Sequence, residues 1–257
     1  MRRLRLRRTE KTEIEYECRP REGRAGTDRG RGMATAVKND IAAAWQTPTD
    51  QPMIRVERLP ELKQKPFYEA VKRAFDFTAA LIGLIVLLVP MAVIAVLVAL
   101  DSPGSPIYFQ TRLGKGEKPF TICKFRTMNK DAEKDGPRWS EKNDRRVTKL
   151  GRFLRRSHLD ELPQLVNILA GQMSFVGPRP ERPEFYDLFD TYIDGFRQRM
   201  TVRPGLTGLA QINGGYELMP EEKIVYDLKY IKERSIAMDL HCVLHTFSVI
   251  FGAGRKG

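Results

Sequence analysis

Residues 77–100 read FTAALIGLIVLLVPMAVIAVLVAL, and none of these 24 side chains carries a charge. At about 1.5 Å per residue, a straight helix of this length covers the roughly 30 Å hydrocarbon core of a lipid bilayer. The run lies too far along the chain, and lacks the small-residue cleavage site, to be a signal peptide. The sequence therefore predicts a membrane helix within residues 66–101.

Pro90 stands near the middle of this run. A proline inside a helix removes one backbone hydrogen bond and clashes with the preceding turn, so we expect a kink there. Both flanks of the run are basic, with Lys72 and Arg73 before it and Arg112 and Lys115 after it. Because positive flanks stay in the cytoplasm, this pattern places both ends on one side. A re-entrant helix broken at Pro90 satisfies both observations; a kinked spanning helix is the alternative.

Residues 1–65 do not resemble a folded domain. Residues 1–32 mix many basic and acidic side chains with almost no periodic apolar positions, so they cannot bury enough surface to offset their ordering entropy. Residues 33–65 are polar and contain several prolines. We predict a disordered basic tail and linker. The tail either binds anionic phospholipid or stays unbound, or translation starts at Met33.

The net charge of +12 favours anionic partners, either phospholipid head groups, nucleotide phosphates or nucleic acid. Composition does not choose among them. The three cysteines, Cys18, Cys123 and Cys242, are scattered, which argues against a disulfide framework or a cysteine zinc site. His241 and His245 could share a helix face, but two histidines without a third ligand are weak support for a metal.

The remainder, residues 102–257, has the pattern of a folded domain. Two extended segments, 105–112 and 119–126, are joined by LGKGEK, which suits a β-hairpin. Residues 127–148 are charged and turn-rich, as in a surface loop. Helices are predicted over 149–170, 184–200 and 221–234, and residues 239–251 are apolar with scattered polar positions. The last of these either lies in the membrane interface or packs on the core. We predict an α+β, mainly helical fold.

Asp160 and Glu161 lie in SHLDELPQLVNIL, residues 157–169. Pro163 suits the first turn of a helix, so the helix begins near Leu159 and holds both carboxylates at its positive end. The helix dipole and the nearby Arg155 favour the ionised form. Two interpretations are open from position alone. The pair is either a nucleophile or magnesium ligand, or an ordinary helix cap.

Two glycine- and proline-rich stretches carry further basic groups. FVGPRPERPEF, residues 175–185, contains Arg179 and Arg182, and TVRPGLTGLAQING, residues 201–214, contains Arg203. The guanidinium fork suits phosphate oxygens, and glycines let backbone N–H groups approach them. Neither stretch matches the phosphate loop of nucleotide hydrolases or the dinucleotide fingerprint.

The order of the motifs is more specific than any one of them. The apolar run is followed by KFRTM, LDELPQLVNIL, SFVGPRPERPEF, VRPGLTG and YDLKYI. Over roughly residues 66–251 the chain resembles the bacterial sugar transferases, which are monotopic polyprenyl-phosphate phosphoglycosyl transferases, in their short catalytic-core form. The resemblance implies a re-entrant membrane helix over 66–101 and a catalytic domain over 102–257. It also implies that this domain faces the cytoplasm at the bacterial inner membrane.

The resemblance implies a chemistry for the two carboxylates. Asp160 would attack the β-phosphate of a UDP-sugar and release UMP, leaving an aspartyl-phosphosugar. Polyprenyl (undecaprenyl) phosphate would then take the phosphosugar, in a ping-pong mechanism. This is the first membrane step of capsule, exopolysaccharide or glycoconjugate synthesis. Mg²⁺, the cofactor of the family, would contact Asp160, and Glu161 would orient that aspartate or handle a proton.

Other site residues follow from the same resemblance. The expected substrate- and phosphate-binding residues are Lys124, Arg126, Arg155, Arg179, Arg203 and Asp227, with Arg155 and Arg179 ranked above Arg203 and Asp227. The family breaks its membrane helix at a Ser-Pro pair, which here reads Val89-Pro90. The serine is absent, so the break depends on Pro90 and its neighbours. Two further departures, LTGLAQ and Asn213-Gly214-Gly215, leave the sugar open.

Two alternatives remain at this level. One is a basic membrane-bound adaptor without catalysis, and the other is a glycosyltransferase that releases UDP. The expected partners are a UDP-sugar, polyprenyl phosphate and membrane phospholipid, without nucleic acid. The sequence leaves the oligomeric state open.

Overall fold

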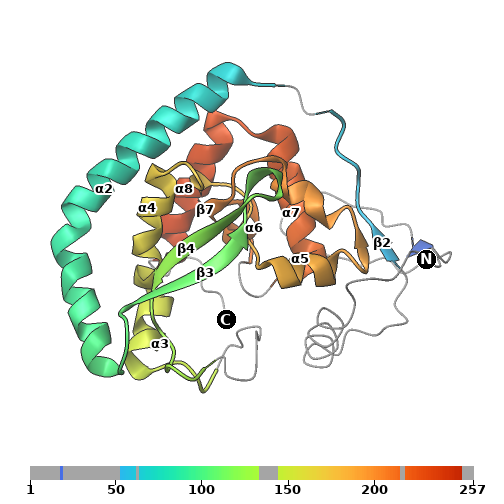
Figure 1. Ribbon diagram of the computed structural model, residues 1–257. Helices are drawn as coiled ribbons and strands as arrows, with labels where there is room; N and C mark the ends of the chain where they lie inside the picture. The colour runs from blue at the N-terminus through green and yellow to red at the C-terminus, as the bar shows by residue number, and fades with distance from the viewer. Residues whose placement is uncertain (1–17, 20–52, 62–63, 133–143, 215–217, 251–257) are drawn as a thin grey trace.

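The computed structural model describes residues 18–19, 53–61, 64–132, 144–214 and 218–250. One long helix, α2 (Pro66–Asp101), arches around a mostly helical domain formed by the residues that follow it (Figure 1). Strands are few and short. The predicted α+β, mainly helical class is therefore confirmed, whereas the predicted basic tail, 1–32, lies almost wholly outside the described residues.

Helix α2 shows one apolar face to the domain and the other to the outside. Its inner stripe recurs every three or four residues, as one helix face must. The stripe consists of Ala80, Leu84, Leu87, Met91, Ile94 and Val98. The outer face leaves large apolar side chains exposed, such as Ile85 at 69% and Val89 at 71%. Within the described ranges, α2 is the one helix long and apolar enough to cross a membrane, by length and composition.

Pro90 does not interrupt α2, which stays helical from Pro66 to Asp101. The predicted break is therefore absent as a gap in the helix, and the ribbon is bowed along its length instead (Figure 1). Pro90 is exposed on the outer face, while the helix on both sides of it packs against the domain. Continuous packing of the inner stripe explains why the loss of one hydrogen bond bends the helix rather than ending it.

Arginines join both ends of α2 to the domain. Near its start, Arg73 donates from Nη1 to the Ile168 carbonyl and from Nη2 to the Leu169 carbonyl, both at 2.8 Å. These carbonyls belong to the last residues of α4 (Leu165–Leu169), which no intrahelical N–H can satisfy. At the other end of α2, Arg126 donates to the carbonyls of Ser102 at 2.5 Å and Pro103 at 3.0 Å. Helix α2 thus caps the end of α4 through Arg73, and Arg126 caps the end of α2.

We expect Arg73→Gln to lower the free energy of unfolding by about 2–3 kcal/mol, because two charge-assisted hydrogen bonds and a favourable helix-end charge are lost. Arg58→Gln is the matched control. Arg58 is 84% exposed and lies 3.8 Å from Asp194, an ion pair that contributes little in water. Thermal unfolding of both variants in detergent is the measurement. Equal melting temperatures for the two would contradict the capping role of Arg73.

The predicted β-hairpin is present. Strands β3 (Ile107–Leu113) and β4 (Pro119–Phe125) pair antiparallel, and a short 3-10 turn, η1 (Lys115–Glu117), joins them. The register sets Tyr108 opposite Lys124, so these two side chains share a face of the hairpin. Strand β4 runs beside the 3-10 helix η2 (Leu159–Gln164). The hairpin therefore places Lys124 next to the residues that begin η2.

The helical segments differ from the prediction in two places. Residues 149–170 form α3 (Lys149–Arg156), η2 and α4, because His158 adopts a positive φ of 57° and ends the first helix. The predicted helix 184–200 is wrong as one element. It is divided into α5 (Pro183–Phe189), strand β6 (Ile193–Asp194) and the 3-10 helix η3 (Phe196–Thr201). Strand pairing overrides helical spacing here, because β6 lies parallel to β2 (Met53–Arg55).

Residues 53–55, within the segment predicted to be a linker, form strand β2, which pairs in turn with β1 (Cys18–Arg19). Strands β5 (Ser174–Val176) and β7 (Gly205–Thr207) pair in parallel. Helices α6 (Leu209–Ile212), α7 (Pro220–Glu233) and α8 (Ile236–Ile250) complete the order, and the predicted helix 221–234 is confirmed.

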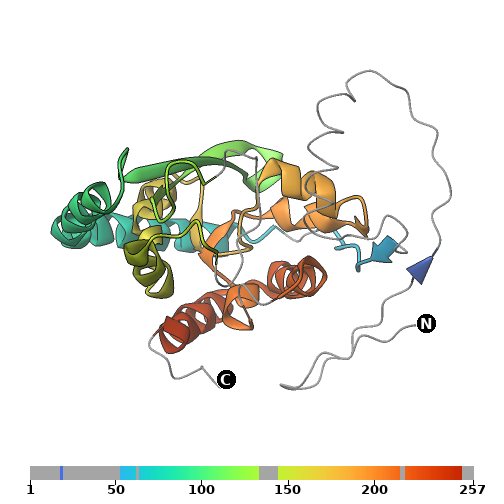
Figure 2. The same cartoon turned by 90° about the horizontal axis from the view of Figure 1, so that it is seen from below.

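The main core lies among α5, η3, α7 and α8. From below, α8 and the hairpin lie on opposite sides of the domain (Figure 2).

Candidate active site

Asp160 and Glu161 occupy the first turn of η2, as Pro163 predicted. The left-handed backbone of His158 turns the chain sharply just before them. Both side chains face inward, and the two residues are only 7% and 5% exposed. Two adjacent carboxylates in so little water need either cationic partners or a proton.

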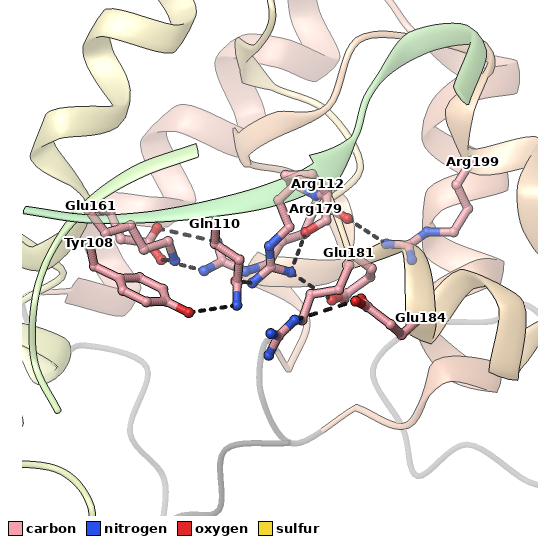
Figure 3. Close-up of polar contacts among 11 residues, drawn as sticks. Tyr108, Gln110, Arg112, Glu161, Arg179, Glu181, Glu184 and Arg199 are labelled. Carbon is pink, nitrogen blue, oxygen red and sulfur yellow. Dashed lines mark hydrogen bonds and ion pairs between the residues drawn. The ribbon is translucent and has the colours of Figure 1, made fainter. Parts of the chain in front are cut away.

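Glu161 has cationic partners on both oxygens. Lys124 Nζ donates to its Oε1 at 2.9 Å, and Arg179 Nη1 donates to its Oε2 at 3.2 Å. Arg179 Nη2 also donates to Oε1, so the guanidinium grips the carboxylate with two nitrogens (Figure 3). Burial alone would raise the pKa of Glu161, but the charges of Arg179 and Lys124 outweigh burial and lower it. Glu161 is therefore a fixed anion with both oxygens occupied.

Asp160 has no hydrogen bond or ion pair with any residue that the structure describes, although it lies beside the same cations. Burial, and next the charge of Glu161, raise its pKa to about 6, against the charges of Lys124, Arg155 and Arg179. The arginines favour ionisation of Asp160, as expected, but burial and the charge of Glu161 outweigh them. At pH 7 the carboxylate is still mostly ionised. It combines a negative charge with free oxygens, which suits attack on phosphorus or binding of a cation.

Arg179 is presented by a loop that leaves β5. The loop passes so close to the next glycine-rich stretch that a Cβ on Gly177 would lie 2.4 Å from the Arg203 carbonyl oxygen. Only glycine permits this approach, since real Cβ atoms do not come so near to backbone. The parallel pairing of β5 with β7 holds the two stretches together. The two glycine- and proline-rich motifs of the sequence are thus one structural unit behind the carboxylates.

The predicted site residues divide into two groups. Lys124 and Arg179 contact Glu161, and Arg155, which donates through Nε to Thr127 Oγ1 at 2.8 Å, is close enough to affect the pKa of Asp160. The other three are engaged elsewhere: Arg126 caps α2, Arg203 donates to the Gly171 carbonyl at 3.1 Å, and Asp227 pairs with Arg199. The structure brings the first group around the carboxylates and gives the second group supporting contacts.

Two arginines were not predicted as site residues, the buried Arg199 and the partly buried Arg112. Arg199 lies on η3 and Arg112 on β3, where Tyr108, Gln110 and Arg112 form a row on one face of the strand (Figure 3). Arg112 Nη2 donates to Gln110 Oε1 at 2.5 Å, and Gln110 Nε2 donates to Tyr108 at 3.0 Å. The alternation of polar residues along β3 was the available signal for Arg112. Arg199 had only its place between the apolar Phe196 and Met200.

The site fits Mg²⁺ only if the substrate completes the coordination. No cluster of three or more His, Cys, Asp or Glu side chains able to hold a metal occurs within the residues that the structure covers. Mg²⁺ commonly uses one or two carboxylates together with substrate phosphates and water. Asp160 supplies one such carboxylate with unoccupied oxygens, whereas Glu161 is held by its cations.

Comparisons with known proteins identify the family of the chain. A family model described as bacterial sugar transferase matches residues 67–253. The chain is 40% identical over 202 residues to an Aeromonas hydrophila UDP-N-acetylgalactosamine-undecaprenyl-phosphate N-acetylgalactosaminephosphotransferase, covering 76% of this chain and 48% of the relative. It is 36% identical over 244 residues to a Caulobacter vibrioides UDP-glucose:undecaprenyl-phosphate glucose-1-phosphate transferase, covering 83% and 89%. An Escherichia coli K12 protein with the latter description is 39% identical over 206 residues, covering 75% and 44%. The chain thus spans about half the length of the first and third relatives.

Proposed function

Since the chain belongs to the bacterial sugar transferase family, we propose that it transfers a sugar 1-phosphate from a UDP-sugar to undecaprenyl phosphate and releases UMP. The observation that carries the proposal is the buried carboxylate of Asp160, which pairs with no described residue, beside a Glu161 held by Lys124 and Arg179. The names of the relatives support the substrate classes. The reaction would begin capsule, exopolysaccharide or glycoconjugate synthesis.

The proposed chemistry has two displacements at one phosphorus. An Asp160 oxygen attacks the β-phosphorus of the UDP-sugar, and the bond from that phosphorus to the bridging oxygen breaks, so UMP leaves with the electron pair. The aspartyl-phosphosugar is then attacked by an oxygen of polyprenyl phosphate, which releases the Asp160 carboxylate and forms polyprenyl diphosphate-sugar. Covalent catalysis of this kind divides one difficult transfer into two steps. Because the Asp160 side chain has no hydrogen bond with a described residue, its carboxylate oxygens are available to attack the β-phosphorus.

Glu161 has a positioning role in this mechanism. A group with a lowered pKa and two occupied oxygens is a poor proton carrier at neutral pH. Its charge instead fixes the Lys124 ammonium and the Arg179 guanidinium next to Asp160. These cations stabilise the negative charge of the phosphoryl group during transfer. Glu161 thus arranges the cations, and Asp160 forms the bond.

Asp160 would also hold Mg²⁺, because it is the carboxylate of the pair that is not already bound. When bound, the ion would neutralise charge on the diphosphate of the substrate. Lys124 and Arg179 face the same region and bring two fixed positive charges of their own.

We further propose that α2 enters the membrane from the cytoplasm and returns to it, with the domain on the cytoplasmic face of the inner membrane. Two contacts support this topology. Arg73 near the start of α2 and Arg126 near its end both join the helix to one and the same domain. A folded domain lies on one side of a bilayer, so its two contact points do also. The exposed apolar outer face of α2 would meet lipid.

Cysteine labelling is expected to place both ends of α2 on one side. In a background without native cysteines, cysteines at Gln64 and at Lys115, both exposed, should react with a membrane-impermeant maleimide only in inverted vesicles. A cysteine at Val89, on the apolar outer face, is the control and should stay unlabelled in both orientations. Labelling of the two end positions from opposite sides would establish a spanning helix instead.

Product analysis tests the proposed reaction. The purified protein in detergent with Mg²⁺ and undecaprenyl phosphate should release UMP from at least one member of a UDP-sugar panel that includes UDP-glucose and UDP-N-acetylgalactosamine. Without acceptor, labelled UMP should exchange into the UDP-sugar, as a ping-pong mechanism requires. Release of UDP would indicate a glycosyltransferase. The absence of both products across the panel would favour a non-catalytic adaptor.

A further inference from the structure

Backbone carbonyls of the loop that carries Arg179 accept hydrogen bonds from other segments of the chain. It reads GPRPER over residues 177–182, and its prolines have no N–H to contribute to a local hydrogen-bond network. Four successive carbonyls each accept a hydrogen bond from another segment. The donors are Gly205 N to Pro178 at 2.9 Å, Arg199 Nη2 to Arg179 at 3.0 Å, Arg112 Nη1 to Pro180 at 3.0 Å and Leu113 N to Glu181 at 3.2 Å. The backbone position of Arg179 therefore depends on these donors.

Arg199 is the brace that acts on Arg179 itself. Its side chain is 1% exposed, its Nε donates to Asp227 Oδ2 at 2.7 Å, and Asp227 is also 1% exposed. The guanidinium lies 4.8 Å from the ring centroid of Phe196 and 5.9 Å from that of Tyr186. Figure 3 shows the Arg199 side chain reaching from η3 to the carbonyl that it holds. The Arg199 charge is thus buried among aromatic rings, with Asp227 as its ion-pair partner and the charge of Glu181 nearby.

Fold stability alone does not explain this pair. Replacing a buried ion pair by apolar residues of similar volume is often neutral or stabilising, because desolvation offsets the attraction between the charges. Arg199 Nη1 and Asp227 Oδ1 are both buried without a hydrogen-bond partner among the described residues, which adds to the cost of burial. The remaining guanidinium nitrogen, Nη2, is directed at the Arg179 carbonyl.

We propose that Arg199 and Asp227 are positioning residues that set the Arg179 guanidinium on Glu161. The proposal rests on the function proposed above and extends it to a residue pair behind the site. Asp227 neutralises and orients Arg199, Arg199 holds the backbone of Arg179, and Arg179 grips Glu161 next to Asp160. Asp227 therefore acts through two arginines and does not contact substrate.

Three variants separate positioning from stability: Arg199→Met, Asp227→Leu and the double variant. Each single change leaves one buried charge unpaired, so both should melt well below the wild type. The double variant removes both charges and should regain most of that loss. Its phosphosugar transfer, measured as UMP release, should nevertheless stay at least tenfold below the wild type, because the Arg179 carbonyl then loses its hydrogen bond from Arg199. Arg197→Met on the same helix, which removes partly exposed ion pairs with Glu117, Asp187 and Asp190, should match the wild type.

Two further measurements make the test decisive. Hydrogen exchange of peptides that cover residues 174–186 should be faster in the double variant and unchanged in Arg197→Met. This reading does not need turnover, so it remains decisive for the brace even if the wild type released no UMP. In an Arg179→Gln background, adding the double change should lower UMP release by less than twofold, since its effect passes through Arg179. A double variant with wild-type exchange, or one that regains activity together with stability, would overturn the proposal, as would a full tenfold loss in the Arg179→Gln background.

Discussion

Asp160→Asn is expected to reduce UMP release at least about a thousandfold while raising the melting temperature of the protein. Asparagine keeps the shape of the side chain and removes the nucleophilic oxygen charge. Asp160 has no hydrogen bond or ion pair with a described residue, so the amide disrupts no contact in that part of the chain. The loss of activity would thus be chemical rather than structural.

The stability gain follows from the pKa of Asp160. The fold raises this pKa from the ordinary 3.8 to about 6, chiefly by burial and next by the charge of Glu161. Ionisation of Asp160 therefore lowers the free energy of unfolding as pH rises from about 4 to 6, and the full loss is present above pH 6. At 1.36 kcal/mol per pKa unit, asparagine should stabilise the protein by about 3 kcal/mol at pH 8. The gain should be clearly smaller at pH 5.

Thermal unfolding at pH 8 and pH 5, in detergent without divalent cations, measures this difference. Asp194→Asn is the matched control. Asp194 is 32% exposed and forms long ion pairs with Arg55 and Arg58. Its substitution should therefore change neither UMP release nor the pH dependence of stability. If Asp160→Asn kept more than a tenth of wild-type UMP release, another residue would be the nucleophile.

Glu161→Gln should have the opposite effect on stability. The substitution leaves Lys124 and Arg179 without their shared counter-charge, although their side chains are only 17% and 22% exposed. Breaking a buried pair in this way costs about 3 kcal/mol. The released cations would also shift relative to the phosphoryl group, so we expect a loss of about a hundredfold or more in kcat. The two substitutions should therefore change stability in opposite directions, because burial disfavours the charge of Asp160, whereas the charge of Glu161 holds two cations.

Melting temperature and UMP release of Glu161→Gln should be read against Glu57→Gln. Glu57 pairs with Lys232 on the surface, where the side chains are 67% and 51% exposed, so this control should change little. A Glu161→Gln protein as stable as the wild type would show that the Lys124 and Arg179 contacts contribute nothing. A stable and fully active variant would remove Glu161 from the mechanism altogether.

Local patterns were sufficient for several elements. The run 77–100 predicted α2, because 24 uncharged residues are long enough for a helix to cover the bilayer core. Pro163 predicted the start of η2, because proline is tolerated best near the start of a helix. The hairpin and α7 were likewise predictable from turn residues and spacing. In each case the determining residues are close in sequence, so short-range rules apply.

Tertiary packing decided what local patterns did not contain. Residues 184–200 have helical spacing, yet β6 forms there because β2 lies alongside. Lys124 meets Glu161 from 37 positions away and Arg199 meets Asp227 from 28, distances over which no periodicity relates one residue to another. The net shift of the Asp160 pKa likewise depends on tertiary packing. Its helix end and neighbouring arginines were visible in the sequence, whereas burial, the largest influence, exists only once distant segments close over the carboxylate.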